Sequence, residues 1–149
     1  MLQEHLSDER IIFFGAEVHK QQALTQLMDI ARGSKKIVDG EKFVSGILER
    51  ENIISTGIGL GIAIPHTYSE AITDVVITVG ISSSGISDYG SIDEKPVHFI
   101  VMVAAGSHQH REYLEILARI SLLAKNEKVR NALLAAQTAA EVITALVDL

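Results

Sequence analysis

One histidine stands directly after a proline and closes a stretch rich in glycine and hydroxyl side chains. The stretch runs from Ser55 to His66 and carries glycines at positions 57, 59 and 61. Glycine reaches backbone angles closed to other residues and lets a partner approach the backbone closely. Neutral imidazole is a competent nucleophile near neutral pH, because its ordinary pKa is about 6.5. These residue types suit phosphoryl transfer through the imidazole of His66.

Phosphoryl transfer depends mainly on positioning and on donors for the charged oxygens. The hydroxyls of Ser55 and Thr56 and the backbone N–H of Gly57 are candidate donors. Arg50 is the nearest upstream cation, and its planar guanidinium matches phosphate geometry. Simpler interpretations stand beside these, since glycine-rich runs are often plain loops and a single histidine is often structural. Arg50 would also be favoured as a solvated cation at a helix C-terminus.

The segment 48–51 and the run from Ser55 to His66 resemble the EIIA domain of the fructose/mannitol class of the phosphoenolpyruvate-dependent sugar phosphotransferase system. Nitrogen-regulatory EIIA proteins share the pattern, and the resemblance covers nearly the whole chain. In that family, the histidine after the proline accepts a phosphoryl group from the phosphorylated carrier HPr or a relative. It passes the group to an EIIB domain, on a cysteine. The resemblance implies that His66 is the phosphorylated nucleophile, that Arg50 stabilises the phosphoryl group, and that the transfer needs no cofactor.

The chain departs from the family at a second, supporting histidine. Members commonly carry this histidine at the start of the helix after the second long strand, but the aligned pair here is Tyr113-Leu114. The Tyr113 hydroxyl can donate one hydrogen bond but cannot carry an imidazolium charge. His110 lies one helical turn earlier and is a partial substitute, and His108 is a weaker one. We therefore expect Tyr113 or His110 to orient the site.

Two other histidine features have structural interpretations. His108 and His110 form a His-x-His pair that could bind a metal in an extended segment, but spacing fixes no third ligand nearby. A solvated loop is the simpler interpretation, and no metal site is predicted. His98 stands near the start of an apolar strand and is expected to be structural.

Composition narrows the classes of partner. The 149 residues carry a net charge of −6 and no cysteine. This charge balance does not indicate a nucleic-acid-binding surface, but an acidic protein can bind a basic patch on a partner protein. No apolar run approaches the roughly 20 residues of a membrane helix, and the N-terminus lacks the apolar region of a signal peptide. The expected location is cytoplasmic, with the membrane reached only through a transporter partner.

Hydrophobic periodicity predicts the elements that position these residues. Strands are expected at 11–14, 62–64, 75–81 and 96–105, and helices at 23–31, 40–51, 111–124, 127–136 and 139–147, with Asp39 or Gly40 and Thr138 as caps. A polar connection is expected at 67–73 and a loop at 82–95. The two long strands are almost continuously apolar and need cover on both faces. The predicted fold is a single α/β domain over 1–149, a three-layer α/β/α arrangement with a central sheet. The mixed strand directions are implied by the resemblance.

Three functions share the predicted site. The first is a phosphohistidine carrier that passes the phosphoryl group from an HPr-like donor to an EIIB domain for sugar transport. The second is a nitrogen-regulatory binding module whose phosphorylation state controls target proteins, because the added charge changes partner affinity. The third is a silent relative that no longer transfers phosphate, which the intact run from Ser55 to His66 disfavours.

Overall fold

The computed structural model describes residues 2–147, so residues 1, 148 and 149 of the predicted 1–149 domain lie outside the described residues. Its strands are β1 (Ile11–Phe13), β2 (Gly57–Gly59), β3 (Ile62–Ala63), β4 (His66–Ser69), β5 (Val76–Ile86) and β6 (Val97–Gly106). Its helices are α1 (Lys20–Arg32), α2 (Gly40–Ile53), α3 (His110–Lys125), α4 (Glu127–Ala135) and α5 (Ala139–Val147), preceded by 3-10 turns at Gln3–His5 and Asp8–Arg10. Within residues 2–147, no helix has the length and apolar character needed to cross a membrane.

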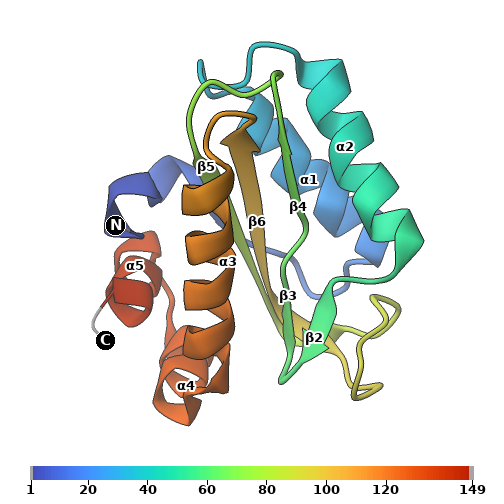
Figure 1. The fold of residues 1–149 in the computed structure, drawn as a ribbon. Helices are drawn as coiled ribbons and strands as arrows, with labels where there is room; N and C mark the ends of the chain where they lie inside the picture. The colour runs from blue at the N-terminus through green and yellow to red at the C-terminus, as the bar shows by residue number, and fades with distance from the viewer. Residues whose placement is uncertain (1, 148–149) are drawn as a thin grey trace.

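The strands form one mixed sheet between two layers of helices (Figure 1). The strand order is β1-β5-β6-β3-β2, and β4 pairs with β6 beyond the end of β3. The long strands β5 and β6 are antiparallel, whereas β3 and β4 run parallel to β6 and β1 runs parallel to β5. The predicted three-layer α/β/α fold with a central mixed sheet is therefore confirmed.

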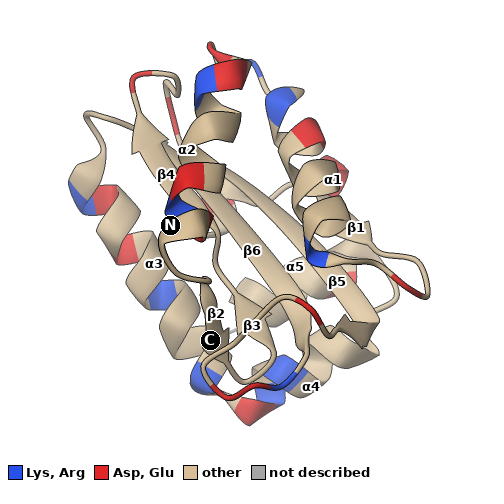
Figure 2. Ribbon diagram, turned by 90° about the vertical axis from the view of Figure 1, so that its right-hand side faces the viewer, with Lys and Arg blue, Asp and Glu red and all other residues tan. Residues whose placement is uncertain are grey.

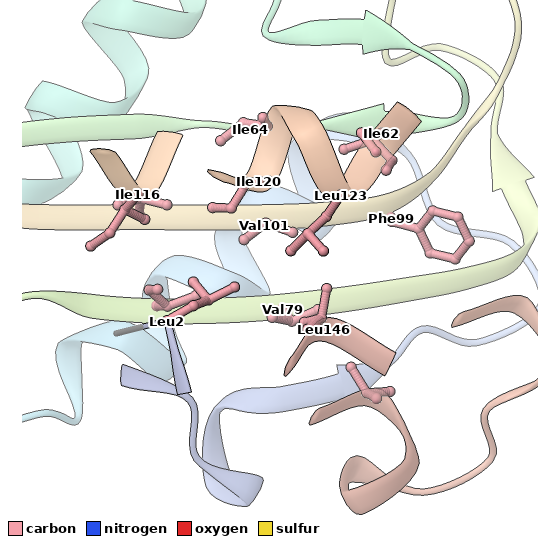
Figure 3. Packing of buried hydrophobic residues seen from close by; sticks show 14 of the residues in the cluster. Leu2, Ile62, Ile64, Val79, Phe99, Val101, Ile116, Ile120, Leu123 and Leu146 are labelled. Atoms are coloured by element: carbon pink, nitrogen blue, oxygen red, sulfur yellow. The ribbon is translucent and has the colours of Figure 1, made fainter. Parts of the chain in front are cut away.

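The core has two halves, one on each face of the sheet. Successive residues of a strand point to opposite faces. Val101 points to the layer of α3, α4 and α5 and packs with Ile116 and Ile120 (Figure 3). Its neighbour Ile100 points to the layer of α1 and α2 and belongs to the cluster of Phe43. The cover on both faces that the apolar strands predicted is thus present.

Charged residues belong to the helices and connections and not to the strands (Figure 2). None of the six described strands carries a Lys, Arg, Asp or Glu. A Lys, Arg, Asp or Glu charge that acts on a group at the sheet must therefore come from a helix or a connection.

The predicted loop over 82–95 is wrong for its first five residues, because β5 continues to Ile86. Ser82 is fully buried despite its hydroxyl. Pairing with β6 shifts register between Ile81 and Ile86, and Gly85 adopts a φ of +87° within this irregularity. A polar strand with a bulge has the composition of a loop, which is why the alternation pattern missed it.

The predicted polar connection over 67–73 is wrong at its start, where His66–Ser69 form β4. This strand runs parallel to β6, with His66 opposite Val103. None of the four residues is buried, so hydrophobic alternation cannot reveal the strand. As a consequence His66 follows β3 as predicted but also opens a strand, which holds its backbone in the sheet.

The glycine-rich stretch is a tight hairpin and not an open loop. Strands β2 and β3 are antiparallel and are joined through Leu60 and Gly61. The φ angles of these two residues are +60° and +79°, in the left-handed region that glycine tolerates best. The hairpin lies at the edge of the sheet, beside the connection that carries Gly90 and Ser91.

Two predicted helix caps are confirmed. The Asp39 side chain accepts a hydrogen bond from the Lys42 backbone N–H at 3.1 Å and begins α2. Thr138 Oγ1 accepts from the Glu141 backbone N–H at 3.2 Å and begins α5. At its other end α2 carries Arg50 in the last turn, as predicted.

Candidate functional site

The backbone around His66 is fixed on both sides. Pro65 offers its carbonyl to the Val103 N–H of β6 at 2.9 Å, and His66 then opens β4. The imidazole turns back toward the chain, so that Nδ1 lies 2.5 Å from the Ile64 carbonyl oxygen. A carbonyl only accepts, so Nδ1 carries the proton, and the neutral ring keeps its lone pair on Nε2.

The surroundings of His66 favour this neutral ring. Burial is the largest influence and lowers the pKa of His66 below its ordinary value of 6.5. The hydrogen bond to Ile64 acts in the opposite direction, the positive charge of Arg50 lowers the pKa further, and the negative charge of Glu51 raises it. Because the net shift is downward, His66 is neutral at neutral pH and Nε2 is available as a nucleophile.

A pocket of about 540 Å³ opens beside His66 and collects five of the seven predicted site residues. These five are Arg50, Ser55, Thr56, Gly57 and His66. The pocket is lined by the last turn of α2, the β2–β3 hairpin, the connection at 90–92 and half-buried residues of α3. Arg50 supplies the one formally charged side chain among the lining residues, so the pocket favours an anion.

Arg50 is held at the C-terminal end of α2. Its Nη1 donates to the Ile54 carbonyl at 2.9 Å. A guanidinium has five N–H donors, so this one contact leaves others for a ligand. Arg50 also acts electrostatically on both His66 and Tyr113, which places its charge within reach of the two rings.

The predicted oxygen donors of the loop already have partners within the protein. Ser55 Oγ donates to the Gly90 carbonyl at 2.6 Å, and Thr56 Oγ1 donates to Glu51 Oε2 at 2.7 Å. The Gly57 N–H donates to Ser55 Oγ at 3.2 Å. The three residues line the pocket, but a phosphoryl group would have to compete with these contacts. Glu51 was missed from the sequence, although a carboxylate four and five residues before two hydroxyls is the signal that could have revealed it.

Tyr113 lies next to His66, with 5.8 Å between the ring centroids. It is 5% exposed, and burial raises the pKa of its hydroxyl, so the hydroxyl stays protonated and neutral. His110 is exposed at the first position of α3, and its ring centroid is 4.9 Å from that of Tyr68 and 6.5 Å from that of Tyr113. Neither Tyr113 nor His110 lines the pocket. Tyr68, 4.9 Å from Tyr113, joins this aromatic cluster and was not predicted.

His98 and His108 lie outside the pocket. The His98 Nδ1 donates to the Ser82 carbonyl at 2.9 Å, which joins β6 to β5. His108 precedes α3 and His110 begins it, so the two do not share the extended segment that a metal pair would need. Among residues 2–147, no three His, Cys, Asp or Glu side chains form a group that could hold a metal ion.

Sequence comparisons place this site in a known context. A family model described as "Phosphoenolpyruvate-dependent sugar phosphotransferase system, EIIA 2" matches residues 4–148. The chain is 31% identical over 132 residues to the fructose-specific EIIA component of Haloferax volcanii, which covers 87% of this chain and 85% of the relative. It is 35% identical over 119 residues to the fructose-specific EIIABC component of Bacillus subtilis, covering 80% of this chain. The match spans only 19% of that longer relative.

Solved structures support the fold. The nitrogen regulatory protein IIA-Ntr of Neisseria meningitidis superposes with a TM-score of 0.87 at 22% identity, covering 97% of this chain and 98% of that chain. The enzyme IIA of the mannitol system of Escherichia coli, solved in complex with phosphorylated enzyme IIB, gives a TM-score of 0.78 at 20% identity, with coverage of 97% and 98%. At these identities the likeness shows that the α/β fold is shared.

Proposed function

The chain belongs to the EIIA 2 family of the phosphoenolpyruvate-dependent sugar phosphotransferase system, and on that premise we propose that His66 is the residue that carries the phosphoryl group. Proteins of this kind are phosphotransferase components that carry a phosphohistidine. The observation that carries the proposal is the hydrogen bond from Nδ1 to the Ile64 carbonyl, which leaves Nε2 unprotonated in a pocket lined by Arg50.

The proposed step is an in-line displacement at phosphorus. The Nε2 lone pair of His66 forms a new N–P bond. At the same time the bond between phosphorus and the histidine nitrogen of the donor breaks, and its electron pair returns to that nitrogen. No proton has to leave His66, because Nδ1 keeps its proton on the Ile64 carbonyl. The reverse sequence at an acceptor regenerates neutral His66.

Arg50 is the proposed stabiliser of the transferred group. Its free N–H donors and positive charge suit the equatorial oxygens, where charge is concentrated. Ser55, Thr56 and Gly57 are proposed to form the wall that positions the group. Tyr113 is the proposed supporting residue, because its neutral hydroxyl can donate a hydrogen bond but adds no charge. We propose that His110 supports the site less directly, through the contacts of its ring with Tyr113 and Tyr68.

Exposed apolar side chains at the pocket fit a protein donor and a protein acceptor. Ile54 and Ile92 line the pocket and are 65% and 81% exposed. Large exposed apolar groups gathered in one place mark surfaces that contact other proteins. We propose a phosphorylated HPr-like carrier as donor and an EIIB domain as acceptor. A cytoplasmic location, as the sequence predicts, belongs to the same proposal.

Phosphate transfer from phosphoenolpyruvate through Enzyme I and HPr, followed by intact mass, tests the role of His66. We expect one acid-labile phosphate on the wild type, none on His66→Ala, and full incorporation on His98→Ala, the matched control. Phosphate on His66→Ala would refute the assignment. The regulatory alternative uses the same phosphorylated histidine, so subsequent transfer to EIIB distinguishes it: a phosphorylated protein that no EIIB discharges would favour a regulatory acceptor.

A further inference from the structure

A carboxylate is buried directly beneath the loop that borders the pocket. Glu51 follows Arg50 in the last turn of α2, and its side chain is 3% exposed. Its Oε1 accepts from the Thr56 backbone N–H at 3.0 Å and lies 3.0 Å from the Lys20 ammonium, while Oε2 accepts from Thr56 Oγ1 at 2.7 Å. A buried carboxylate is costly unless it is paired and hydrogen-bonded, and Glu51 is both.

Two further hydrogen bonds continue from Thr56 to His66. The Thr56 carbonyl accepts from the Ile64 N–H at 3.2 Å. The Ile64 carbonyl in turn accepts from His66 Nδ1 at 2.5 Å. Glu51 therefore holds the backbone of Thr56, Thr56 holds Ile64, and Ile64 selects the ring nitrogen that carries the proton.

We propose that Glu51 is a positioning residue that fixes the tautomer of His66 through Thr56 and Ile64. The inference rests on the proposed role of His66 as phosphoryl acceptor and adds a residue that does not touch the phosphoryl group. A ring held with its proton on Nδ1 presents Nε2 at every encounter with the donor. A ring free to exchange tautomers presents a protonated, unreactive Nε2 for part of the time.

The neighbours of Glu51 hold its carboxylate in one position. The Lys20 ammonium comes from the first turn of α1 and also lies over the Tyr89 ring, 4.4 Å from its centroid. The Tyr89 hydroxyl lies 3.3 Å from Thr56 Oγ1 on the side away from solvent. Lys20 therefore restrains Glu51 and Tyr89, and Tyr89 contacts Thr56 directly.

The substitution Glu51→Gln tests the inference because it preserves size and replaces one acceptor oxygen with an NH2 group. An amide NH2 cannot accept from Thr56, so either the backbone N–H loses its acceptor or the hydroxyl must turn round and accept from the amide; both outcomes disturb the wild-type contacts of Thr56. We expect NMR of the His66 ring nitrogens to show Nδ1 protonated in the wild type and a mixture of tautomers in the variant. Phosphoryl acceptance should slow by about 10- to 100-fold, the range for small misplacements of a reacting group.

Lys20→Met is the matched control. It removes the ion pair and lowers stability, but it leaves both Thr56 contacts of Glu51 in place. We expect a lowered Tm with the wild-type tautomer. Equal tautomer shifts in both variants, or an unshifted tautomer in Glu51→Gln, would overturn the inference.

A second variant covers the case in which Glu51→Gln does not fold. Thr56→Val removes the Oγ1 contacts with Glu51 and Tyr89 but keeps the backbone N–H on Glu51, so a smaller shift in the same direction is expected. An unchanged tautomer in Thr56→Val would then count against the inference. The tautomer is measured without any phosphoryl donor, so the comparison of tautomers between wild type and variants tests the role of Glu51 by itself. A wild type that takes up no phosphate would refute the proposed function but would not affect that comparison.

Discussion

At the scale of single residues, the lowered pKa of His66 sets the pH range expected for the proposed phosphoryl acceptance. Burial keeps the ring neutral at pH values where an exposed histidine would already be protonated. A neutral ring is required for attack on phosphorus, so the acidic limit of phosphoryl acceptance should follow the pKa of this one residue.

We expect the rate of phosphoryl acceptance to stay high as pH falls through 6.5 and to decline only below it. In the unfolded chain His66 binds a proton near its ordinary pKa of 6.5, whereas in the folded protein it binds the proton only at lower pH. Stability therefore rises with pH between the folded and the unfolded pKa and is lost as pH falls below 6.5. NMR titration of His66, beside acceptance rates from pH 5 to 8, measures both effects. A His66 pKa at or above 6.5 would contradict the prediction.

The charge on Arg50 is one named cause of this shift and can be removed separately. Arg50→Gln should raise the pKa of His66 relative to the wild type, while Arg50→Lys should leave it nearly unchanged because the charge is kept. Both variants should slow transfer, since lysine lacks the planar fork that matches phosphate. A pKa that fails to rise in Arg50→Gln would assign the whole shift to burial.

The sequence predicted roles for His66 and Arg50 but gave no prediction for Glu51, for a physical reason. Proline, glycine and hydroxyl residues beside a histidine form a distinctive local pattern, so their types and spacing are informative even though each residue type also has simpler uses. A glutamate at the end of a helix has the composition of an ordinary solvated residue. Only the fold shows that Glu51 points inward, to Thr56 and Lys20.

At the scale of elements, close backbone contact fixes the hairpin that borders the pocket. A Cβ at Gly57 would lie 2.4 Å from the Gly90 carbonyl oxygen, whereas a Cβ at Gly15 would meet nothing within 4 Å. Backbone atoms cannot move aside as a flexible side chain can. The hairpin and the 90–92 connection must therefore separate if residue 57 has a side chain.

Gly57→Ala should lower the free energy of unfolding by about 1–3 kcal/mol, the usual cost of forcing extra atoms into a packed site. It should also slow phosphoryl acceptance, because both displaced segments line the pocket. Gly15→Ala is the control and should leave both quantities close to wild type. Denaturant unfolding and the transfer assay check the pair, and equal effects of the two substitutions would refute the steric argument.

The errors in predicted elements share one cause. Strand β4 and the last residues of β5 are polar or irregular, so their hydrogen bonds to β6 leave no hydrophobic alternation in the sequence. The helices and the two long strands were predictable because burial of one face, or of both, dictates their pattern. Backbone pairing at the edges of the sheet has no such requirement, and the site lies at one of those edges.

At the scale of the whole molecule, the site draws on every layer. Arg50 comes from the α1–α2 layer, His66 from the sheet, and Leu117 and Ser121 from α3 on the other side. The layered fold followed from the sequence, because apolar strands without charge need helices on both faces. The convergence of these residues on one pocket could not be predicted from the sequence, since it depends on how the edge strands and helix ends meet.

The two halves of the core should contribute independently to stability. Ile47 and Ile116 are fully buried in different clusters, on opposite faces of the sheet. Ile47→Val and Ile116→Val should each lower the free energy of unfolding by about 0.5–1.5 kcal/mol. The effects of substitutions at residues without shared partners are additive. The loss of free energy of unfolding in the double variant should therefore equal the sum of the two single losses within about 0.5 kcal/mol.

Denaturant unfolding of the two single variants and the double variant measures this coupling. A coupling above about 0.5 kcal/mol would mean that packing changes cross the sheet. Leu117 and Arg50 approach the pocket from these two layers, so such coupling would also move the pocket walls relative to one another. Additivity would instead show that the sheet isolates the layers. Changes at the surface of α4 and α5 would then leave Arg50 and His66 in place.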